Sequence, residues 1–358
     1  MGGGWADVGE AVVTYQSIRA YPAPLVGRLT PSGPYFVDPT GALVIRRSLT
    51  AFCAPKRVTT GRLSDLRAYL DWAAARGFNE VRIFSRTDWT GPPGKGVESG
   101  WAYDEAACET VLTEAAQRGL RVEVTALTYA SALDEMAAHL ERVDRLCQRH
   151  ENAILEGANE PQVNGIDMLA VLGRYTPRSV PWASGVYEPN PYPAGSFVTY
   201  HSPRKDEWSR CAKDAHEFYT GDGPTQKFTP AYHGPVMLDE PPQVEQTIRD
   251  KDRPDAWPDV ADDWRAYAML CAFFGAGGLL HGNPGFQQCV VPTDATVLAC
   301  VEAFIAGFAA VPVQRYSGYS GALQPTPSSN PGSRRYRRTG EDGRTYEVTV
   351  RPSGFGVV

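Results

Sequence analysis

From about Gly41 onward, short runs of apolar and β-branched residues alternate with longer amphipathic segments. Val81-Arg82-Ile83-Phe84 and Leu120–Leu127 are runs of the first kind and predict strands. Between them, apolar side chains at helical spacing predict a helix over Glu105–Gln117, which Gly119 ends. Strands that alternate with helices in this way are typical of repeated βα units and a parallel sheet.

The whole pattern predicts eight strands and seven helices. The strands are expected at 43–45, 81–84, 120–127, 153–157, 182–186, 197–200, 235–239 and 278–280. The helices are expected at 63–76, 105–117, 132–147, 168–175, 207–218, 264–274 and 295–309. A parallel crossover needs about a dozen residues or more, and 187–196 is short and rich in proline. The helix between strands five and six is therefore expected to be missing or reduced.

We predict an α/β fold of the (β/α)8 TIM-barrel type over residues 41–312. Residues 1–40 form an N-terminal extension with two possible short strands, and 313–358 form a C-terminal β-hairpin appendage. In that hairpin, Arg335–Arg338 pairs with Tyr346–Arg351 around a turn at Glu341-Asp342-Gly343. A doubly wound open sheet is the rival fold, but it needs a Gly-rich phosphate turn after its first strand, and the sequence has none there.

Charge and hydropathy narrow the range of partners. The formal net charge is -6 and is spread along the chain, so we expect no nucleic-acid partner. One basic cluster, at Arg334, Arg335, Arg337 and Arg338, is interpreted as the solvated face of the hairpin. No run approaches the roughly 18 apolar residues of a membrane span, so we expect no membrane partner.

The N-terminus and the cysteines add little about function. Met1–Trp5 shows neither the charged nor the apolar region of a signal peptide, which leaves a cytoplasmic protein or a secreted one without its signal. The seven cysteines are widely spaced and contain no Cys-x-x-Cys pair, so they are interpreted as buried apolar residues. The oligomeric state does not follow from the sequence.

Two carboxylates follow predicted strands at the catalytic end of such a barrel. Strand four runs into Asn159-Glu160-Pro161, and strand seven runs into Asp239-Glu240-Pro241. Catalytic groups of (β/α)8 enzymes lie where strands end and βα loops begin. Hydrolysis of a glycosidic bond with retention needs two carboxyl groups about 5–5.5 Å apart, one protonated and one ionised. Glu160 and Glu240 are the candidates, with Asp239 or Glu245 as alternatives to the latter.

At these residues the sequence resembles the clan A glycosidases, the (β/α)8 superfamily with its acid/base on strand four and its nucleophile on strand seven. Leu155–Pro161 is similar to the strand-four motif, an Asn-Glu-Pro preceded by another Glu. The resemblance implies that Glu160 is the acid/base and that Asn159 binds the sugar 2-hydroxyl. It covers roughly residues 36–310.

Other positions of the resemblance nominate further site residues. Gly77–Ile83 is similar to the strand-two pattern, in which Arg82 would support the nucleophile, and Pro235–Glu240 nominates Glu240. His201 fits the strand-six position near the substrate. His281 stands after strand eight, where many members have a Trp.

Strand parity and loop aromatics complete the candidate site. Glu156 has the same parity as Glu160, so we expect it to point toward the barrel axis in a structural role. Arg82 is flanked by apolar residues, so its guanidinium should enter the barrel and need a carboxylate, which Glu240 would supply. Three aromatic residues of the loops are expected to contact sugar rings: Trp89, Tyr129 and Tyr187.

The expected function is a retaining O-glycosidase that acts on an oligo- or polysaccharide and needs no cofactor or metal. One alternative is an inactive barrel that binds carbohydrate or serves as an attachment module, because Ser202-Pro203 and His281 depart from the superfamily pattern. Another is a metal-dependent hydrolase with ligands among His201, His233 and His281, although no His-x-His or His-Glu-x-x-His pair occurs. The sugar, the linkage and endo or exo action are left open.

Overall fold

The structure is a computed structural model. It describes residues 27–89, 97, 99–179, 181–185, 195–201, 234–240, 260–317, 334–351 and 354–357. Predictions for Tyr187, the helix at 207–218, His233 and Glu245 lie outside these residues.

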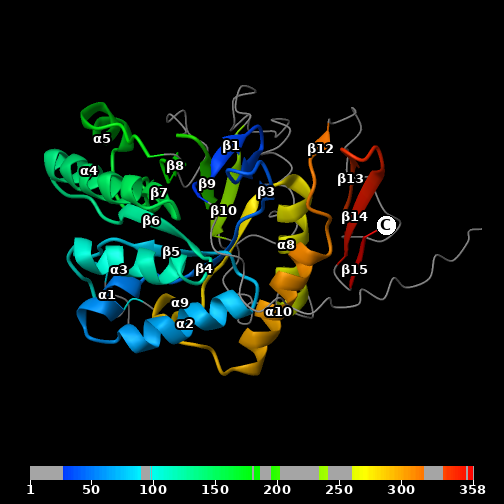
Figure 1. The fold of residues 1–358 in the computed structure, drawn as a ribbon, viewed down its shortest axis with the longest axis horizontal. Helices are drawn as coiled ribbons and strands as arrows, with labels where there is room; N and C mark the ends of the chain where they lie inside the picture. The colour runs from blue at the N-terminus through cyan, green and yellow to red at the C-terminus, as the bar shows by residue number, and fades with distance from the viewer. Residues whose placement is uncertain are drawn as a thin grey trace, which may run out of the picture.

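The centre of the molecule is a parallel sheet of eight strands (Figure 1). Its members in chain order are β4 (Arg47–Thr50), β5 (Glu80–Phe84), β6 (Arg121–Leu127), β7 (Ala153–Ala158), β8 (Trp182–Ala183), β9 (Val198–His201), β10 (Val236–Glu240) and β11 (Gly277–Leu280). The order across the sheet is β8-β7-β6-β5-β4-β11-β10-β9. Ser196 and Phe197, just before β9, donate backbone hydrogen bonds to the carbonyl of Trp182 in β8, at 2.8 and 3.3 Å. These bonds join the two ends of the sheet, and the predicted (β/α)8 barrel is confirmed.

Helices cover the outer face of this sheet. They are α1 (Ala54–Thr59), α2 (Leu63–Ala75), α3 (Glu105–Ala116), α4 (Leu133–Arg149), α5 (Met168–Arg174), α8 (Val260–Phe274), α9 (Pro284–Gln287) and α10 (Ala295–Ala309). The sequence explains their limits. The carboxylate of Asp104 accepts a hydrogen bond from the Ala107 amide and so begins α3. Gly119 has a φ of 70° just after α3, a backbone conformation that glycine adopts without strain.

The prediction for the first barrel strand was wrong. Leu43–Val44 forms β3, which pairs antiparallel with β2 (Tyr35–Val37), and β2 pairs with β1 (Thr30–Ser32) in a separate three-stranded sheet. The first barrel strand is β4, four residues further on. Its sequence, Arg-Ser-Leu-Thr, contains only one apolar residue, Leu49. The apolar run at 43–45 therefore gave the stronger strand signal, although it belongs to the N-terminal sheet.

The C-terminal hairpin is confirmed as part of a four-stranded antiparallel sheet. Its strands are β12 (Tyr316–Ser317), β13 (Arg334–Gly340), β14 (Thr345–Arg351) and β15 (Gly354–Val357). Figure 1 shows this sheet beside α8. The expectation of a fully solvated basic face was wrong at Arg338, which is buried and donates hydrogen bonds to the carbonyls of Phe273 and Tyr316, at 2.7 and 3.0 Å. The next residue toward the N-terminus, Arg337, is exposed, as the alternation of a strand requires.

The strands separate an apolar outer layer from a polar interior. Val81 and Ile83 of β5 belong to the hydrophobic core with the helices, whereas Arg82 between them is buried among charged groups. β6 and β7 repeat this alternation at Glu123 and Glu156. The alternation thus places buried charge inside the barrel, beneath the strand ends where βα-barrel enzymes carry their sites. Among the described residues, no helix has the length and apolar character that a membrane crossing requires.

Candidate functional site

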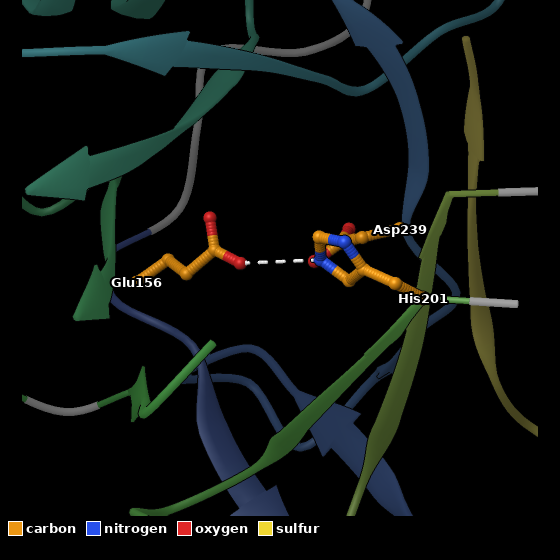
Figure 2. A group of neighbouring side chains, drawn as sticks. All are labelled: Glu156, His201 and Asp239. Atoms are coloured by element: carbon orange, nitrogen blue, oxygen red, sulfur yellow. Dashed lines mark ion pairs between the residues drawn. The ribbon is translucent and has the colours of Figure 1, made fainter. Parts of the chain in front are cut away.

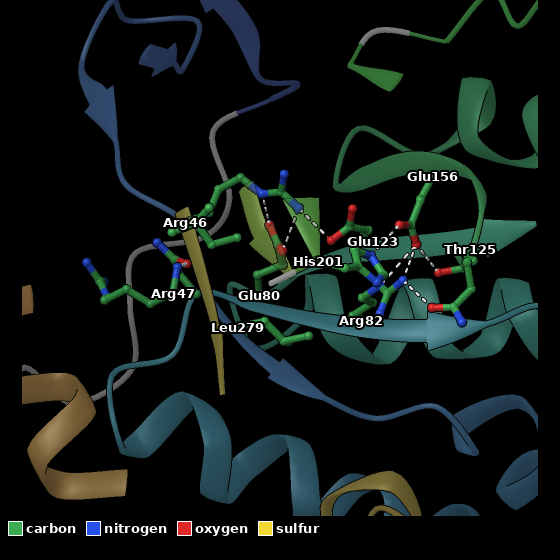
Figure 3. Close-up of polar contacts among 12 residues, drawn as sticks. Arg46, Arg47, Glu80, Arg82, Glu123, Thr125, Glu156, His201 and Leu279 are labelled. Atoms are coloured by element: carbon green, nitrogen blue, oxygen red, sulfur yellow. Dashed lines mark hydrogen bonds and ion pairs between the residues drawn. The ribbon is translucent and has the colours of Figure 1, made fainter. Parts of the chain in front are cut away.

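The deeper part of the barrel interior is an ion-pair cluster around Arg46 (Figure 3). The Arg46 guanidinium donates to both carboxylate oxygens of Glu80, at 2.6 and 2.7 Å, and to Oε2 of Glu123 at 2.8 Å. All three side chains are buried. Two carboxylates thus share one guanidinium. Burial, the Asp239 carboxyl and then the other carboxylates raise the pKa of Glu123 well above its usual range, although Arg46 lowers it.

A second cluster joins Arg82 to strand β7. Nε and Nη2 of Arg82 donate to Oε2 of Glu156 at 3.0 and 2.6 Å, and Thr125 donates to the same oxygen at 2.5 Å. Burial acts to raise the pKa of Glu156, but Arg82 first, and then His201 and Thr125, bring it below its usual value. Glu156 is therefore ionised. Among the described residues, the carboxylate bonded to Arg82 is that of Glu156. The Glu240 side chain, which the sequence analysis expects as a partner of Arg82, lies outside the description.

Asn159 connects this cluster to the end of β7. Its Oδ1 accepts a hydrogen bond from Nη2 of Arg82 at 2.9 Å, and its backbone amide donates to the Leu127 carbonyl at 2.7 Å. Because Oδ1 faces Arg82, the orientation of the side-chain amide is fixed and its NH2 group points the other way. Asn159 is thus held as a hydrogen-bond donor, as a role toward a sugar hydroxyl requires.

Glu160 follows with an unusual backbone. Its φ is 42°, and the only other non-glycine residue with a positive φ in the described part of the chain is Cys289. Such a conformation costs free energy and persists only where the surroundings impose it, often at functional sites. The Glu160 carbonyl accepts hydrogen bonds from the amides of Val163 and Asn164, both at 2.9 Å. The side chain keeps a small exposed fraction, since the residue is 7% accessible.

His201, at the end of β9, lies between two carboxylates. Its Nδ1 is 3.3 Å from Oε1 of Glu160, and its Nε2 is 3.7 Å from Oε1 of Glu156, the pair drawn in Figure 2. The imidazole is fully buried. In the sheet, the backbone of His201 is paired with that of Glu240 in β10. His201 thus contacts one predicted catalytic residue by its side chain and is the strand partner of the other.

Asp239 enters the same space by the alternation of β10, because Met237, two residues earlier, packs in the interior, whereas Leu238 faces the outer core. Leu238 pairs with Tyr200 and Glu240 pairs with His201, so Asp239 is an extra residue, a β-bulge. Its carboxylate is fully buried, and neither oxygen has a hydrogen-bond partner among the described residues. Burial raises the pKa of Asp239 to about 7; Arg82 opposes this shift and Glu156 adds to it.

The other predicted site residues differ in how far they are buried. Trp89 is 40% exposed and lies 6.2 Å from the Phe84 ring, centroid to centroid. Tyr129 is half-buried with the Arg86 guanidinium over its ring at 4.9 Å. His281 is buried, and its Nδ1 is 3.0 Å from the Thr50 hydroxyl. His281 is thus held inside the barrel wall, whereas Trp89 offers an exposed aromatic face.

The sequence analysis passed over Glu123 and Arg46 and considered Asp239 only as an alternative acid. For Glu123 a signal was available, because it stands between Val122 and Val124 just as Arg82 stands between Val81 and Ile83. For Asp239 the signal is weaker, because only one of its neighbours, Leu238, is apolar. Strand parity puts it on the same face as Met237, which packs in the interior, and on the face opposite to Glu240.

One group of described residues could hold a metal ion by its spacing. One ligand atom each of Glu156, His201 and Asp239 lie within 4.8 Å of one another. The guanidinium of Arg82, bonded to Glu156, already supplies a positive charge at this point. Its presence favours a network of ion pairs here.

Comparisons with known proteins agree with the fold. No protein-family model matches the chain, and no curated protein matches it in sequence. Among solved structures, a family 5 glycoside hydrolase from Bacteroides vulgatus is similar at a TM-score of 0.61 and 15% identity, with 92% of this chain and 82% of that one covered. A β-glucanase from Saccharophagus degradans has a TM-score of 0.55 at 13% identity, with 80% and 97% covered. An exo-β-1,4-mannosidase from an Opitutaceae bacterium has a TM-score of 0.51 at 18% identity, with 78% and 62% covered. The predicted resemblance to the (β/α)8 glycosidases is therefore confirmed at the level of the fold.

Proposed function

We propose that the protein is a retaining glycoside hydrolase in which Glu160 is the acid/base and Glu240 the nucleophile. The observation that carries this proposal is the position of His201, whose ring contacts Glu160 and whose backbone pairs with Glu240. Neighbouring parallel strands are about 4.8 Å apart, so the backbone of Glu240 belongs to the immediate surroundings of the Glu160 carboxyl. Two carboxyl groups at one end of the barrel are what double displacement needs.

The proposed reaction has two steps. A carboxylate oxygen of Glu240 attacks the anomeric carbon, the bond to the leaving oxygen breaks, and Glu160 gives its proton to that oxygen. In the second step, Glu160 takes a proton from water, the water oxygen bonds to the anomeric carbon, and the Glu240 carboxylate is released. The configuration at the anomeric carbon is inverted twice and is therefore retained.

The surrounding residues support these steps in the proposal. The fixed amide of Asn159 donates to the sugar 2-hydroxyl, where hydrogen bonds strengthen in the transition state. Arg82 keeps Glu156 ionised below the site. The exposed face of Trp89 and the ring of Tyr129 stack on sugar rings, and His281 supports the wall of the site. Glu160 and Glu240 perform the proposed chemistry without a cofactor.

The names of the similar structures suggest where to look for a substrate. They include a β-glucanase and an exo-β-1,4-mannosidase, so β-linked glucans and mannans are the first class to test. The experiment incubates the protein with soluble β-1,4-glucan, β-1,4-mannan and their aryl glycosides, and follows the first-formed anomer by proton NMR. We expect β-anomer products from the parent protein. Glu240→Ala should remove most of the turnover of every substrate, and Glu160→Gln most of the turnover of the polysaccharides.

Two results would overturn the proposal. First-formed α-anomers would indicate inversion, which requires carboxyl groups about 6.5–9.5 Å apart. Glycan binding without hydrolysis of any ligand would favour a carbohydrate-binding or attachment module on the same fold.

A further inference from the structure

Among the described residues, the barrel interior holds more carboxyl groups than guanidinium groups around the proposed site. Glu80, Glu123, Glu156 and Asp239 are all fully buried, and the guanidinium groups in contact with them are those of Arg46 and Arg82. Burying an uncompensated charge is costly, so protons must supply the missing positive charge.

The contacts show which of these carboxylates already have a guanidinium partner. Glu80 is bonded to Arg46 through both oxygens, and Glu156 is bonded to Arg82 through Oε2. Glu123 receives one bond from Arg46, at the deeper end of the network. Asp239 receives no hydrogen bond from the described residues. Its carboxylate lies beside Glu156 and His201, with one atom of each of the three side chains within 4.8 Å of the other two, and Oε1 of Glu156 faces the His201 ring. Among the described residues, the imidazole of His201 is the titratable cation that lies beside Asp239.

We propose that Asp239 is a positioning residue which, together with Glu156, serves as the counter-ion of His201 and so controls the charge of the ring that contacts Glu160. The effect on catalysis rests on the proposed function, whereas the assignment of Asp239 as a counter-ion of His201 does not. Among the described residues, the carboxyl groups that face His201 are those of Glu156 in β7, Glu160 just after β7 and Asp239 in β10. Asp239 is in turn influenced by Arg82, Glu156, His201 and Arg46, and it acts on Glu123.

The alternation of β10 turns Asp239 toward the interior, because Met237, two residues earlier, packs there with Ile154 and Phe197. In a regular strand the next residue, Glu240, would turn to the opposite face. The register shift between Leu238 and Glu240 is a bulge of the kind that re-aims side chains beside active sites. Asp239, with its pKa of about 7, titrates in the same range as an ordinary imidazole. The two groups therefore share protons instead of titrating independently.

The consequence for the proposed reaction has a definite sign. A charged His201 favours the ionised form of Glu160, and a neutral His201 favours the protonated form that donates to the leaving oxygen. Removing the Asp239 charge disfavours the charged imidazole. Glu160 should then keep its proton to higher pH.

The first test needs no substrate. Nitrogen-15 NMR of the imidazole rings follows the titration of His201, whose signals are identified by their loss in His201→Gln. In the parent protein we expect His201 to titrate above the ordinary value of about 6.5, although burial acts in the opposite direction. In Asp239→Asn the midpoint should fall by about one pH unit or more. Glu123→Gln, an acid-to-amide change in the same interior at a carboxyl that faces Arg46 and whose pKa is raised, removes less charge and should move the midpoint less than half as far.

The opposite results overturn the proposal. A parent His201 that titrates below about 6.5 would show that its counter-ions do not hold the charge, even if Asp239→Asn does not fold. An unchanged midpoint in a folded Asp239→Asn would show the same.

The second test uses catalysis. The alkaline limb of the pH profile of kcat/KM should move up by about one unit in Asp239→Asn, and by no further amount when Asp239→Asn is added to His201→Gln. An unmoved limb with normal stability would contradict the positioning role. If His201 shifts in the NMR titration but no glycoside is hydrolysed by the parent protein, the counter-ion assignment holds and the glycosidase proposal fails.

Discussion

His201 Nδ1 lies 3.3 Å from Glu160 Oε1, although their strands are six places apart in the hydrogen-bonded order of the sheet. In a flat sheet, that separation would be about 29 Å at the usual spacing of neighbouring strands. The contact therefore exists because the sheet closes on itself where the bonds to Trp182 join its ends. Closure brings together the strand-four and strand-six residues of the proposed site.

The first prediction concerns the acid/base. Glu160→Gln should lower kcat on glycosides with poor leaving groups by about 10²–10⁴-fold, because the leaving oxygen no longer receives a proton. Activated aryl glycosides, which leave without protonation, should lose much less of their first-step rate. Equal losses on both kinds of substrate would contradict the role of Glu160 as acid.

The backbone at Glu160 gives a second prediction. At ordinary positions alanine is more stable than glycine by about 0.4–1 kcal/mol. At Glu160, where φ is 42°, the order should reverse, with Glu160→Gly more stable than Glu160→Ala by about 1 kcal/mol in denaturant unfolding. Gly173 in α5 is the control, since its φ is not positive and nothing lies within 4 Å of an added Cβ, so Gly173→Ala should stabilise. Alanine as the more stable residue at both positions would exclude strain at Glu160.

The buried pair of Arg82 and Glu156 gives a third prediction. Arg82→Met leaves the Glu156 carboxylate buried without its cation and should lower the free energy of unfolding by about 3–5 kcal/mol. Adding Glu156→Gln should restore part of this loss, because the remaining charge is removed. Arg145→Met, which breaks the exposed pair with Glu141 on α4, should cost about 0.5 kcal/mol or less. Similar losses for Arg82→Met and Arg145→Met would contradict the importance of the buried network.

The barrel could be predicted because short apolar strand segments alternate with amphipathic helical segments along the sequence. Strand alternation also predicted that Arg82, between Val81 and Ile83, and Glu156, with the parity of Glu160, point inward. The first strand was misplaced because β4 has only Leu49 as an apolar residue and lines the barrel with Ser48 and Thr50, both buried.

The contacts of the site could not be predicted in the same way. The partner of Arg82 depends on how neighbouring strands are staggered, and strand parity says only which face a residue occupies. The register shift between Leu238 and Glu240, beside the proposed nucleophile, is signalled by no residue pattern. The 3.3 Å contact between His201 and Glu160 depends on barrel closure, a property of the whole sheet.

His139 gives a fourth prediction, on the pH dependence of stability. Burial first, and then Arg86 and Arg142, lower the pKa of His139 to about 3, while its Nε2 lies 3.1 Å from the Ala126 carbonyl oxygen. The unfolded chain therefore binds a proton near pH 6.5 that the folded protein binds only near pH 3. Stability from this residue is present above pH 6.5 and is lost as the pH falls toward 3, by up to about 5 kcal/mol.

His139→Gln should flatten this acid loss in unfolding curves measured between pH 3 and 7. The control is His150→Gln, because His150 lies at the end of α4 and is partly exposed. A parent protein and a His139→Gln variant with the same slope would show that His139 is protonated equally in both states.

The most direct measurement of the central claim is the trapping of the glycosyl-enzyme. The protein is incubated with a 2,4-dinitrophenyl 2-deoxy-2-fluoro-β-glycoside of glucose or mannose, digested, and analysed by mass spectrometry. We predict one sugar per chain, attached to the peptide that contains Glu240 and located on that residue, with no label in Glu240→Ala. Label on Asp239 or on another carboxylate, or turnover of the unfluorinated glycoside without any trapped adduct, would contradict the assignment of Glu240 as nucleophile.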